Sequence, residues 1–343
     1  MKIPPALILF FLAPAIAELL SGSAPPSEFF NPIIFIILAS LYGSGALIIR
    51  ELKIRWNKSY VTTFILGAAY GILEEGLMVK SFFDPNWMDL GILGRYGRWL
   101  GVNWVWAEWL TIYHAIYSIA IPITLAELAY IERRNESWIG NKTLALLTIL
   151  LGAVTLLGHL YLTPYKPAPI HIIITAITIL SLIIIAWKIP PKTGKRGKQQ
   201  PPNPTKLAIA GYMISAGLFA LFMAGPHIIP QPPLIIILGT ILITATSKLL
   251  NQYKWSEQTL YQKYALTAGA IAFLITLTPI QELDKNRPDN PQGMLIVGIT
   301  AAILLLLLKR KIKQKLIAHH LTHKNTKLSH PSSNSNIESR ADN

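Results

Sequence analysis

Long apolar stretches, separated by short polar breaks, make up most of the chain. Each stretch has about the 20 mainly apolar residues that a helix needs to cross a bilayer. The pattern predicts an all-α fold, a polytopic transmembrane helical bundle of about ten spans in a single domain over residues 1–308. The predicted spans are 3–21, 32–49, 60–80, 104–129, 143–162, 169–187, 206–224, 233–250, 264–280 and 294–308.

The first apolar segment has two interpretations. Lys2, the apolar run after it and the small residues Ala15-Ile16-Ala17 resemble a signal peptide with its cleavage site. Pro4-Pro5 at the start and Glu18 directly after the run favour a retained helix instead. If the segment is cleaved, nine spans remain, and every later loop keeps its predicted side of the membrane.

Composition and charge support the membrane class. Only 14% of the 343 residues are charged, against about 25% in an ordinary soluble domain. When the N-terminus is placed in the cytoplasm, 25 of the 31 lysines and arginines fall in inside segments, as the positive-inside rule requires. We therefore predict that both ends are cytoplasmic, and we attribute the net charge of +14 to topology and not to nucleic-acid binding.

Three polar segments complete the predicted organisation. Residues 188–206 form a basic cytoplasmic linker, and residues 309–343 a basic, partly disordered cytoplasmic tail. Residues 82–103 form an outside loop, and the stretch from Trp87 to Trp109 holds five of the nine tryptophans. Tryptophans at this depth often form only an interfacial belt. The glycines, arginines and aspartates of the loop favour a lid over a site below it.

Such a lid has residues suited to an anionic or sugar-bearing head group. Arginine binds anions through paired hydrogen bonds, and aromatic rings stack on sugars and cations. We expect substrate contacts from Trp87, Arg95, Arg98 and Trp99 in the loop and from Glu108 in the following span.

Ionisable residues inside the predicted spans need a reason, because each costs about 2.5–3.5 kcal/mol at the helix centre on insertion scales. With the predicted topology, all the main candidates lie in the outer half of the bilayer or at its midplane. They are Glu18, Glu74, Glu75, Glu108, His114 and His159. Glu127 falls at the cytoplasmic end of its span and is expected to be solvated.

Local spacing favours an inward orientation for Glu74 and Glu75. Gly67 and Gly71 form a small-xxx-small step that lets another helix approach closely, and the pair continues the same face. Two adjacent carboxyls in a low-dielectric site repel each other, so one should hold a proton and leave an acid beside a base. The alternative is a structural role through hydrogen bonds to neighbouring helices.

The order Glu74-Glu75, His114, His159 resembles the motifs EExxxR, FxxxH and HxxxN of the CPBP family, the CAAX-processing and bacteriocin-processing glutamate intramembrane proteases. Val79, Leu110 and Thr163 replace the Arg, Phe and Asn of those motifs. The stretch 74–109 is also similar to uncharacterised prokaryotic multispanning membrane proteins that share its segment from Glu74 to Pro85. These resemblances imply a prokaryotic plasma membrane and, for the CPBP family, a glutamate that activates water.

The leading functional hypothesis is therefore a membrane-embedded hydrolase acting on a membrane peptide or lipid substrate. Glu74 or Glu75 would be the general base, while His114 and His159 would polarise the carbonyl or bind a divalent metal. With no cysteine in the chain, a thiolate metal site or Cys nucleophile is excluded. Metal dependence and oligomeric state stay open.

Two other functions fit the same residues. A proton-coupled transporter or channel also uses intramembrane carboxylates and histidine, and Gly/Pro breaks lie within the spans at Pro14, Gly43 and Pro122. A transferase that uses a lipid-linked donor would place its site in the outside loop, with Asp84 or Asp89 essential.

Overall fold

The computed structural model describes residues 3–191, 197–285 and 287–329, and most of these residues are helical. The sheet among them is one antiparallel pair, β1 (Arg98–Trp99) and β2 (Val102–Asn103), in the predicted outside loop. The all-α class is therefore confirmed. Parts of the predicted linker (192–196) and tail (330–343) lie outside the described residues.

Several long helices in the first part of the chain contain a π-helical segment. In chain order the helical elements are α1 (Pro5–Pro14), η1 (Ala15–Leu20), α2 (Pro26–Phe29), α3 (Pro32–Leu38), η2 (Ala39–Gly43), α4 (Ser44–Arg55), α5 (Tyr60–Ile72), η3 (Leu73–Met78), η4 (Gly91–Gly94), α6 (Trp104–Tyr113), η5 (His114–Ala120), α7 (Ile121–Ala129) and η6 (Ile131–Arg133). Of these, η1, η2, η3 and η5 are π-helical, whereas η4 and η6 are single 3₁₀ turns.

The remainder of the chain consists of longer helices joined by short turns. The elements are α8 (Asn141–Tyr161), α9 (Pro169–Lys188), α10 (Pro204–Phe219), η7 (Ala220–Ala224), α11 (Gly225–Ile228), α12 (Pro232–Asn251), η8 (Glu257–Thr259), α13 (Leu260–Leu283) and α14 (Met294–Ser329). Proline at the first helical turn, where its missing N–H removes no bond, begins α9, α10 and α12.

Every predicted span coincides with a helix. Among the described residues, eight helices are long and apolar enough to cross a membrane: Pro32–Arg55, Tyr60–Met78, Trp104–Ala129, Asn141–Tyr161, Pro169–Lys188, Pro204–Ile228, Pro232–Asn251 and Glu257–Leu283. The first predicted span is a shorter apolar helix, Pro5–Leu20, and the last is the start of α14, which continues through the basic residues after Leu308. A multispanning helical protein is confirmed, whereas ten crossings and their sidedness stay predictions.

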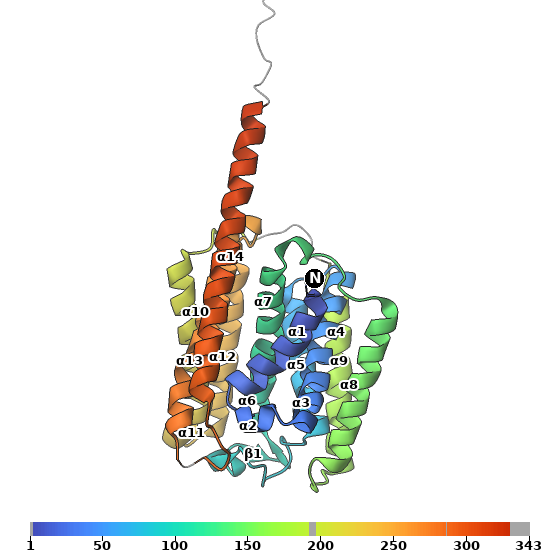
Figure 1. Cartoon of the computed structure of the whole chain (residues 1–343). Helices are drawn as coiled ribbons and strands as arrows, with labels where there is room; N and C mark the ends of the chain where they lie inside the picture. Colours follow the sequence, from blue (N-terminus) through green and yellow to red (C-terminus); the bar gives the residue numbers. More distant parts are fainter. Residues whose placement is uncertain (1–2, 192–196, 286, 330–343) are drawn as a thin grey trace, which may run out of the picture.

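Different helix ends and short elements lie at the two ends of the bundle. The start of α1 and the C-terminal end of α14 lie at one end, and α2, α11 and the β-hairpin lie at the other (Figure 1). α14 projects well beyond the bundle (Figure 1). The first and last described residues, 3 and 329, therefore lie at the same end of the bundle (Figure 1).

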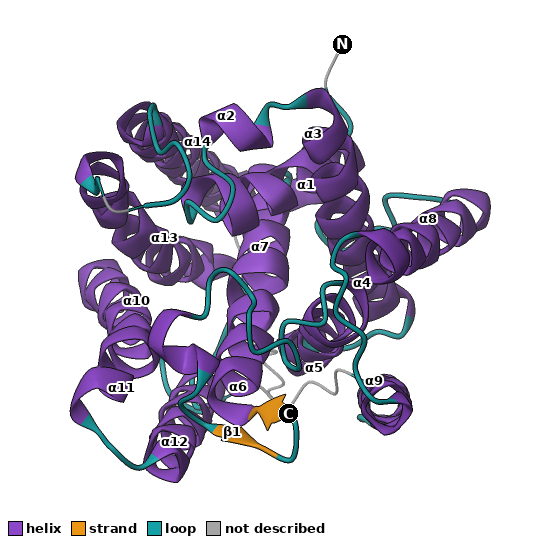
Figure 2. Cartoon of the chain, turned by 90° about the horizontal axis from the view of Figure 1, so that it is seen from below, coloured by secondary structure: helices purple, strands orange, loops and turns teal. Residues whose placement is uncertain are grey.

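The helix formed by α6, η5 and α7 is the centre of the bundle. In its most apolar 18-residue stretch 83% of the residues are buried, against 22% for α8, 17% for α9 and 11% for α12. Seen from below, it lies between a group containing α10, α12, α13 and α14 and a group containing α4, α5, α8 and α9 (Figure 2). The outer helices leave apolar side chains exposed, as lipid-facing helices do, and polar side chains on the central helix are shielded from both water and lipid.

Close packing of α5 against the central helix is confirmed at the predicted glycines. A methyl group added at Gly67 would lie 2.8 Å from the Ala115 Cα atom, and one at Gly71 would lie 2.8 Å from the His114 Cβ atom. Only glycine permits this approach, which brings the C-terminal end of α5 against η5.

The predicted solvation of Glu127 is wrong. The residue is 6% exposed and accepts hydrogen bonds from Lys53 (2.5 Å) and Tyr60 (2.6 Å). Arg50, fully buried, lies 3.6 Å from the same carboxylate. Hydropathy placed Glu127 at a helix end. In the structure, the neighbouring α4 packs against this end of the helix, so Glu127 is buried together with Arg50 and Lys53 of α4.

Candidate functional site

Four π-helical segments bring polar side chains together inside the bundle. η1 carries Glu18, η2 carries Tyr42, η3 carries Glu74 and Glu75, and η5 carries His114. We call these five side chains the Glu/His cluster. π-helical segments inside α-helices occur often at functional sites. Here they lie beside the sequence breaks, since η1 follows Pro14, η2 ends at Gly43 and η5 precedes Pro122.

His114 lies between the two adjacent glutamates. Its Nδ1 atom is 3.3 Å from Glu74 Oε2, and its Nε2 atom is 3.0 Å from Glu75 Oε1. The Ser118 hydroxyl is 2.9 Å from Nδ1. A neutral imidazole has one ring hydrogen and can donate to only one carboxylate, whereas the imidazolium donates to both. The pairing of these groups therefore depends on where the protons are.

Tyr42 joins the pair to a third carboxyl group. Its hydroxyl is hydrogen-bonded to both Glu18 Oε1 and Glu74 Oε1. A phenol has one hydrogen to donate. The second contact is therefore a hydrogen bond only when one of the two carboxyls carries a proton and donates it to the phenol oxygen. If both contacts are hydrogen bonds, at least one of the two carboxyls carries a proton.

The cluster continues from Glu75 toward the predicted outside loop. The Ser81 hydroxyl donates to Glu75 Oε2, and the Trp106 indole donates to the Ser81 oxygen at 3.0 Å. Both side chains are buried. The start of the loop and the first turn of α6 therefore hold the Glu75 carboxylate in place.

Burial is uneven along the cluster. Tyr42, Glu74, Glu75 and His114 are at most 8% exposed, while Glu18 is half-buried. In the described part of the chain, the ion pairs of Glu74 and Glu75 are both with His114. Because buried carboxylates are costly without such partners, His114 stabilises both glutamates, together with the hydrogen bonds from Tyr42 to Glu74 and from Ser81 to Glu75.

The same side chains suit a divalent cation. One ligand atom each from Glu74, Glu75 and His114 lies within 4.8 Å of the others. Glu74 Oε2 is buried, and its 3.3 Å contact with His114 Nδ1 is an ion pair and not a hydrogen bond within the described residues. Carboxylate and imidazole together suit zinc, manganese or iron, so the donor set fits a transition metal.

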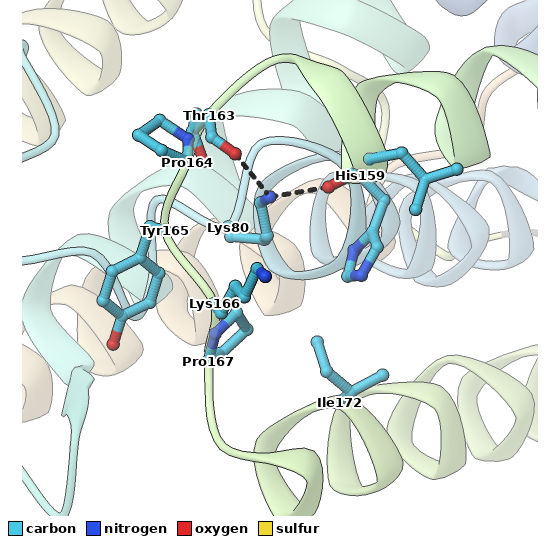
Figure 3. Close-up of a pocket in the computed structure, with 9 residues that line it drawn as sticks. Lys80, His159, Thr163, Pro164, Tyr165, Lys166, Pro167 and Ile172 are labelled. Carbon is cyan, nitrogen blue, oxygen red and sulfur yellow. Dashed lines mark hydrogen bonds between the residues drawn. The ribbon is translucent and has the colours of Figure 1, made fainter.

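His159, expected in the same site, lies elsewhere. Its Nδ1 atom is 2.6 Å from the Leu77 carbonyl oxygen, and its half-buried ring lines a pocket at the end of α8 with Lys80 and Lys166 (Figure 3). The Glu74, Glu75 and His114 group does not include it. Facing helices bring the first three predicted residues together, while α8 presents its histidine to this outer pocket.

The predicted substrate-binding residues of the loop have other contacts. Arg98 donates to the backbone oxygens of Phe83 (2.7 Å) and Asp84 (3.3 Å), which ties the two ends of the loop together. Trp87 is half-buried, while Trp99 and Arg95 are exposed. Arg98 thus maintains the loop, and the exposed residues remain available at its surface.

Two further acids lie near the cluster but outside it. Glu108 is half-buried between α6 and α12 and accepts a hydrogen bond from Thr240 at 2.8 Å. Asp89 is exposed on the loop, yet partial desolvation of its carboxyl and the negative charge of Glu75 raise its pKa above the usual 3.8.

The profile of an uncharacterised membrane protein family matches residues 7–303. The chain belongs to this family. The match spans all of the Glu/His cluster and most of the bundle. No curated protein and no solved structure matches the chain.

In this family member, sequence reasoning missed Tyr42, Ser81, Trp106 and Ser118. Ser118 had a usable signal, since it lies four residues after His114 and residues at that spacing share a helix face. Tyr42 directly precedes the Gly43 break, but nothing in its spacing indicates a contact with two glutamates. Those contacts join helices far apart in the chain.

Proposed function

We propose that this membrane protein is a proton-coupled carrier in which the Glu/His cluster takes up and releases protons. The observation that carries the proposal is Tyr42, whose hydroxyl contacts two carboxyl groups although it has a single hydrogen to donate. Groups linked in this way hold a proton that can move among them by small rearrangements. Chains of Asp, Glu and His within a bundle are typical of proton relays in pumps and transporters.

The contacts form one continuous path. It runs from half-buried Glu18 through Tyr42 to Glu74, then through His114 to Glu75. Glu18 is the more accessible end, and Glu75 is the end next to the loop. A proton entering at Glu18 therefore has a donor or acceptor at each step.

The π-helical segments support a carrier over a static hydrogen-bonded core. Carriers commonly bind their coupling ions where membrane helices are interrupted. Here the helices containing η1, η2, η3 and η5 all depart from α-helical geometry where they contribute cluster residues. Such segments can shift register locally without unfolding the helix.

Infrared difference spectroscopy of the reconstituted protein, comparing acidic with alkaline buffer, tests the proposal. We expect a buried carboxylic acid band that titrates with the buffer and is reduced in Glu74→Gln, because this variant removes a carboxyl that shares the Tyr42 hydrogen. A spectrum with no titrating band, or one identical in the variant, would contradict proton exchange at the cluster.

Metal-assisted hydrolysis is the second candidate function. It is favoured by the ligand atoms of Glu74, Glu75 and His114 that lie within 4.8 Å of one another. A divalent metal supplies a bound water activated as a nucleophile at neutral pH. The two glutamates and His114 would hold the ion, and His159, at its separate position, would not take part.

Metal content and peptide cleavage separate the two candidates. If the hydrolase is correct, protein purified with added zinc or manganese retains the ion and cleaves a membrane peptide, and His114→Ala loses both. Retained cleavage in His114→Ala, or wild-type protein that holds no ion, would exclude the metal hydrolase. Neither result would affect the infrared test of proton exchange.

A further inference from the structure

Lys80 has an unusual backbone conformation. Its φ angle is +64°, in the left-handed region that costs a non-glycine residue about 1–2 kcal/mol. The residue directly follows the C-cap of η3, a position at which glycine is usual. Strained backbone conformations of this kind are found mostly at functional sites, so the Lys80 side chain is a candidate for a functional role.

The Lys80 side chain reaches the end of α8. Its ammonium group donates to the backbone oxygens of His159 (2.7 Å) and Thr163 (3.2 Å), and the residue is only 2% exposed. An ammonium group has three hydrogens, so these two bonds leave one for a ligand. Lys80 thereby fixes a positive charge at the turn between α8 and α9.

This charge lies in the wall of a pocket. The pocket has a volume of about 320 Å³ and is also lined by His159, Lys166, Tyr165 and Ile172. Figure 3 shows Lys80, Lys166 and His159 around the same space. The Nδ1 atom of His159 faces a carbonyl oxygen, which can only accept, so Nδ1 carries a hydrogen. The lining thus combines two cations with an imidazole, and none of the described residues that form it is acidic.

The helices beside the pocket present apolar side chains to their surroundings. Leu156, Leu157 and Leu160 on α8 and Ile173 and Ile177 on α9 are each more than half exposed. A ligand that fits here has an anionic head for the pocket and hydrocarbon for these helix faces. Basic pockets between membrane helices bind phosphate-bearing head groups in this way.

We propose that the pocket at the α8–α9 turn binds the phosphate head group of an anionic phospholipid, with the acyl chains against the exposed faces of α8 and α9. Lys80 and Lys166 attract the negatively charged phosphate. The Lys80 ammonium group is already held in position by its hydrogen bonds to the end of α8. The site is separate from the Glu/His cluster and does not depend on the carrier proposal.

Titration of the full-length protein in detergent with fluorescent phosphatidylglycerol tests the site. We expect saturable binding that weakens about fivefold in Lys166→Gln and about 25-fold in Lys80→Gln/Lys166→Gln, from the loss of one basic residue at a time. The matched control is Lys142→Gln/Lys188→Gln, which removes two exposed lysines at the opposite end of the same two helices. This control should bind like the wild type.

Three results would overturn the proposal. Equal weakening of phosphatidylglycerol binding in both double variants would show only a general charge effect. If fluorescent phosphatidylcholine bound as tightly as phosphatidylglycerol, the site would not recognise the negative charge of the head group. Inorganic phosphate displacing the lipid at equal concentration would show a free-phosphate site. Lys166→Gln keeps the Lys80 bonds to α8, so it remains informative if the Lys80 variant fails to fold.

Discussion

Replacing Tyr42 with phenylalanine should reduce proton flux through the reconstituted protein by about 100-fold, the scale on which a positioned proton-transfer group acts. The variant removes a single oxygen and keeps the ring that packs beside Tyr70 and His114. Glu18 and Glu74 then lose the hydroxyl that contacts both of them. The path is interrupted while its titratable members remain.

Tyr117→Phe is the matched control. Tyr117 is also fully buried, and it lies in η5, which also carries His114. Both substitutions remove a buried tyrosine hydroxyl. The Tyr117 hydroxyl, however, is not part of the path from Glu18 to Glu75. We expect its proton flux to equal that of the wild type.

Liposomes containing a pH-sensitive dye provide the measurement, with a potassium gradient and valinomycin driving proton entry. Wild-type flux above that of empty liposomes, loss of this flux in Tyr42→Phe and its retention in Tyr117→Phe would support the path. A Tyr42→Phe variant that matches the wild type would remove Tyr42 from the mechanism.

Glu127→Gln should destabilise the protein by about 3–5 kcal/mol, through the end of the bundle where α1 begins. Lys53 and Arg50 are buried and lie 2.5 and 3.6 Å from the Glu127 carboxylate. Loss of its negative charge leaves Lys53 facing a neutral amide in a low-dielectric setting. Removing one member of a buried ion pair costs more than the pair itself contributes.

Thermal unfolding in detergent, followed by circular dichroism, measures this effect. Glu257→Gln is the control, because Glu257 pairs with Arg134 at the surface and is 67% exposed in its side chain. Exposed pairs contribute about 0–1 kcal/mol, so its unfolding temperature should stay near the wild-type value. Equal shifts in the two variants would show that burial does not strengthen the Glu127 interaction.

The candidate site could be predicted only where the spacing of residues along one helix shows which face they share. Gly67, Gly71 and the pair Glu74-Glu75 follow one helix face at intervals of three or four residues, so their contact with another helix was expected. His114 was found because a histidine at the midplane of a span is unusual. His159 satisfied the same reasoning, but the rotation of α8 turns its ring toward Leu77 and Lys80.

The sequence by itself determined the membrane class, the position of nearly every helix and the set of ionisable residues that had to be explained. These follow from hydropathy over about 20 residues and from the cost of charge in a bilayer, which are properties of single segments. Only the tertiary structure decided which polar groups meet. The contacts of Tyr42 with Glu18 and Glu74, and of Glu127 with Lys53, join different helices, and the rotation and depth of each helix are set by packing against its neighbours.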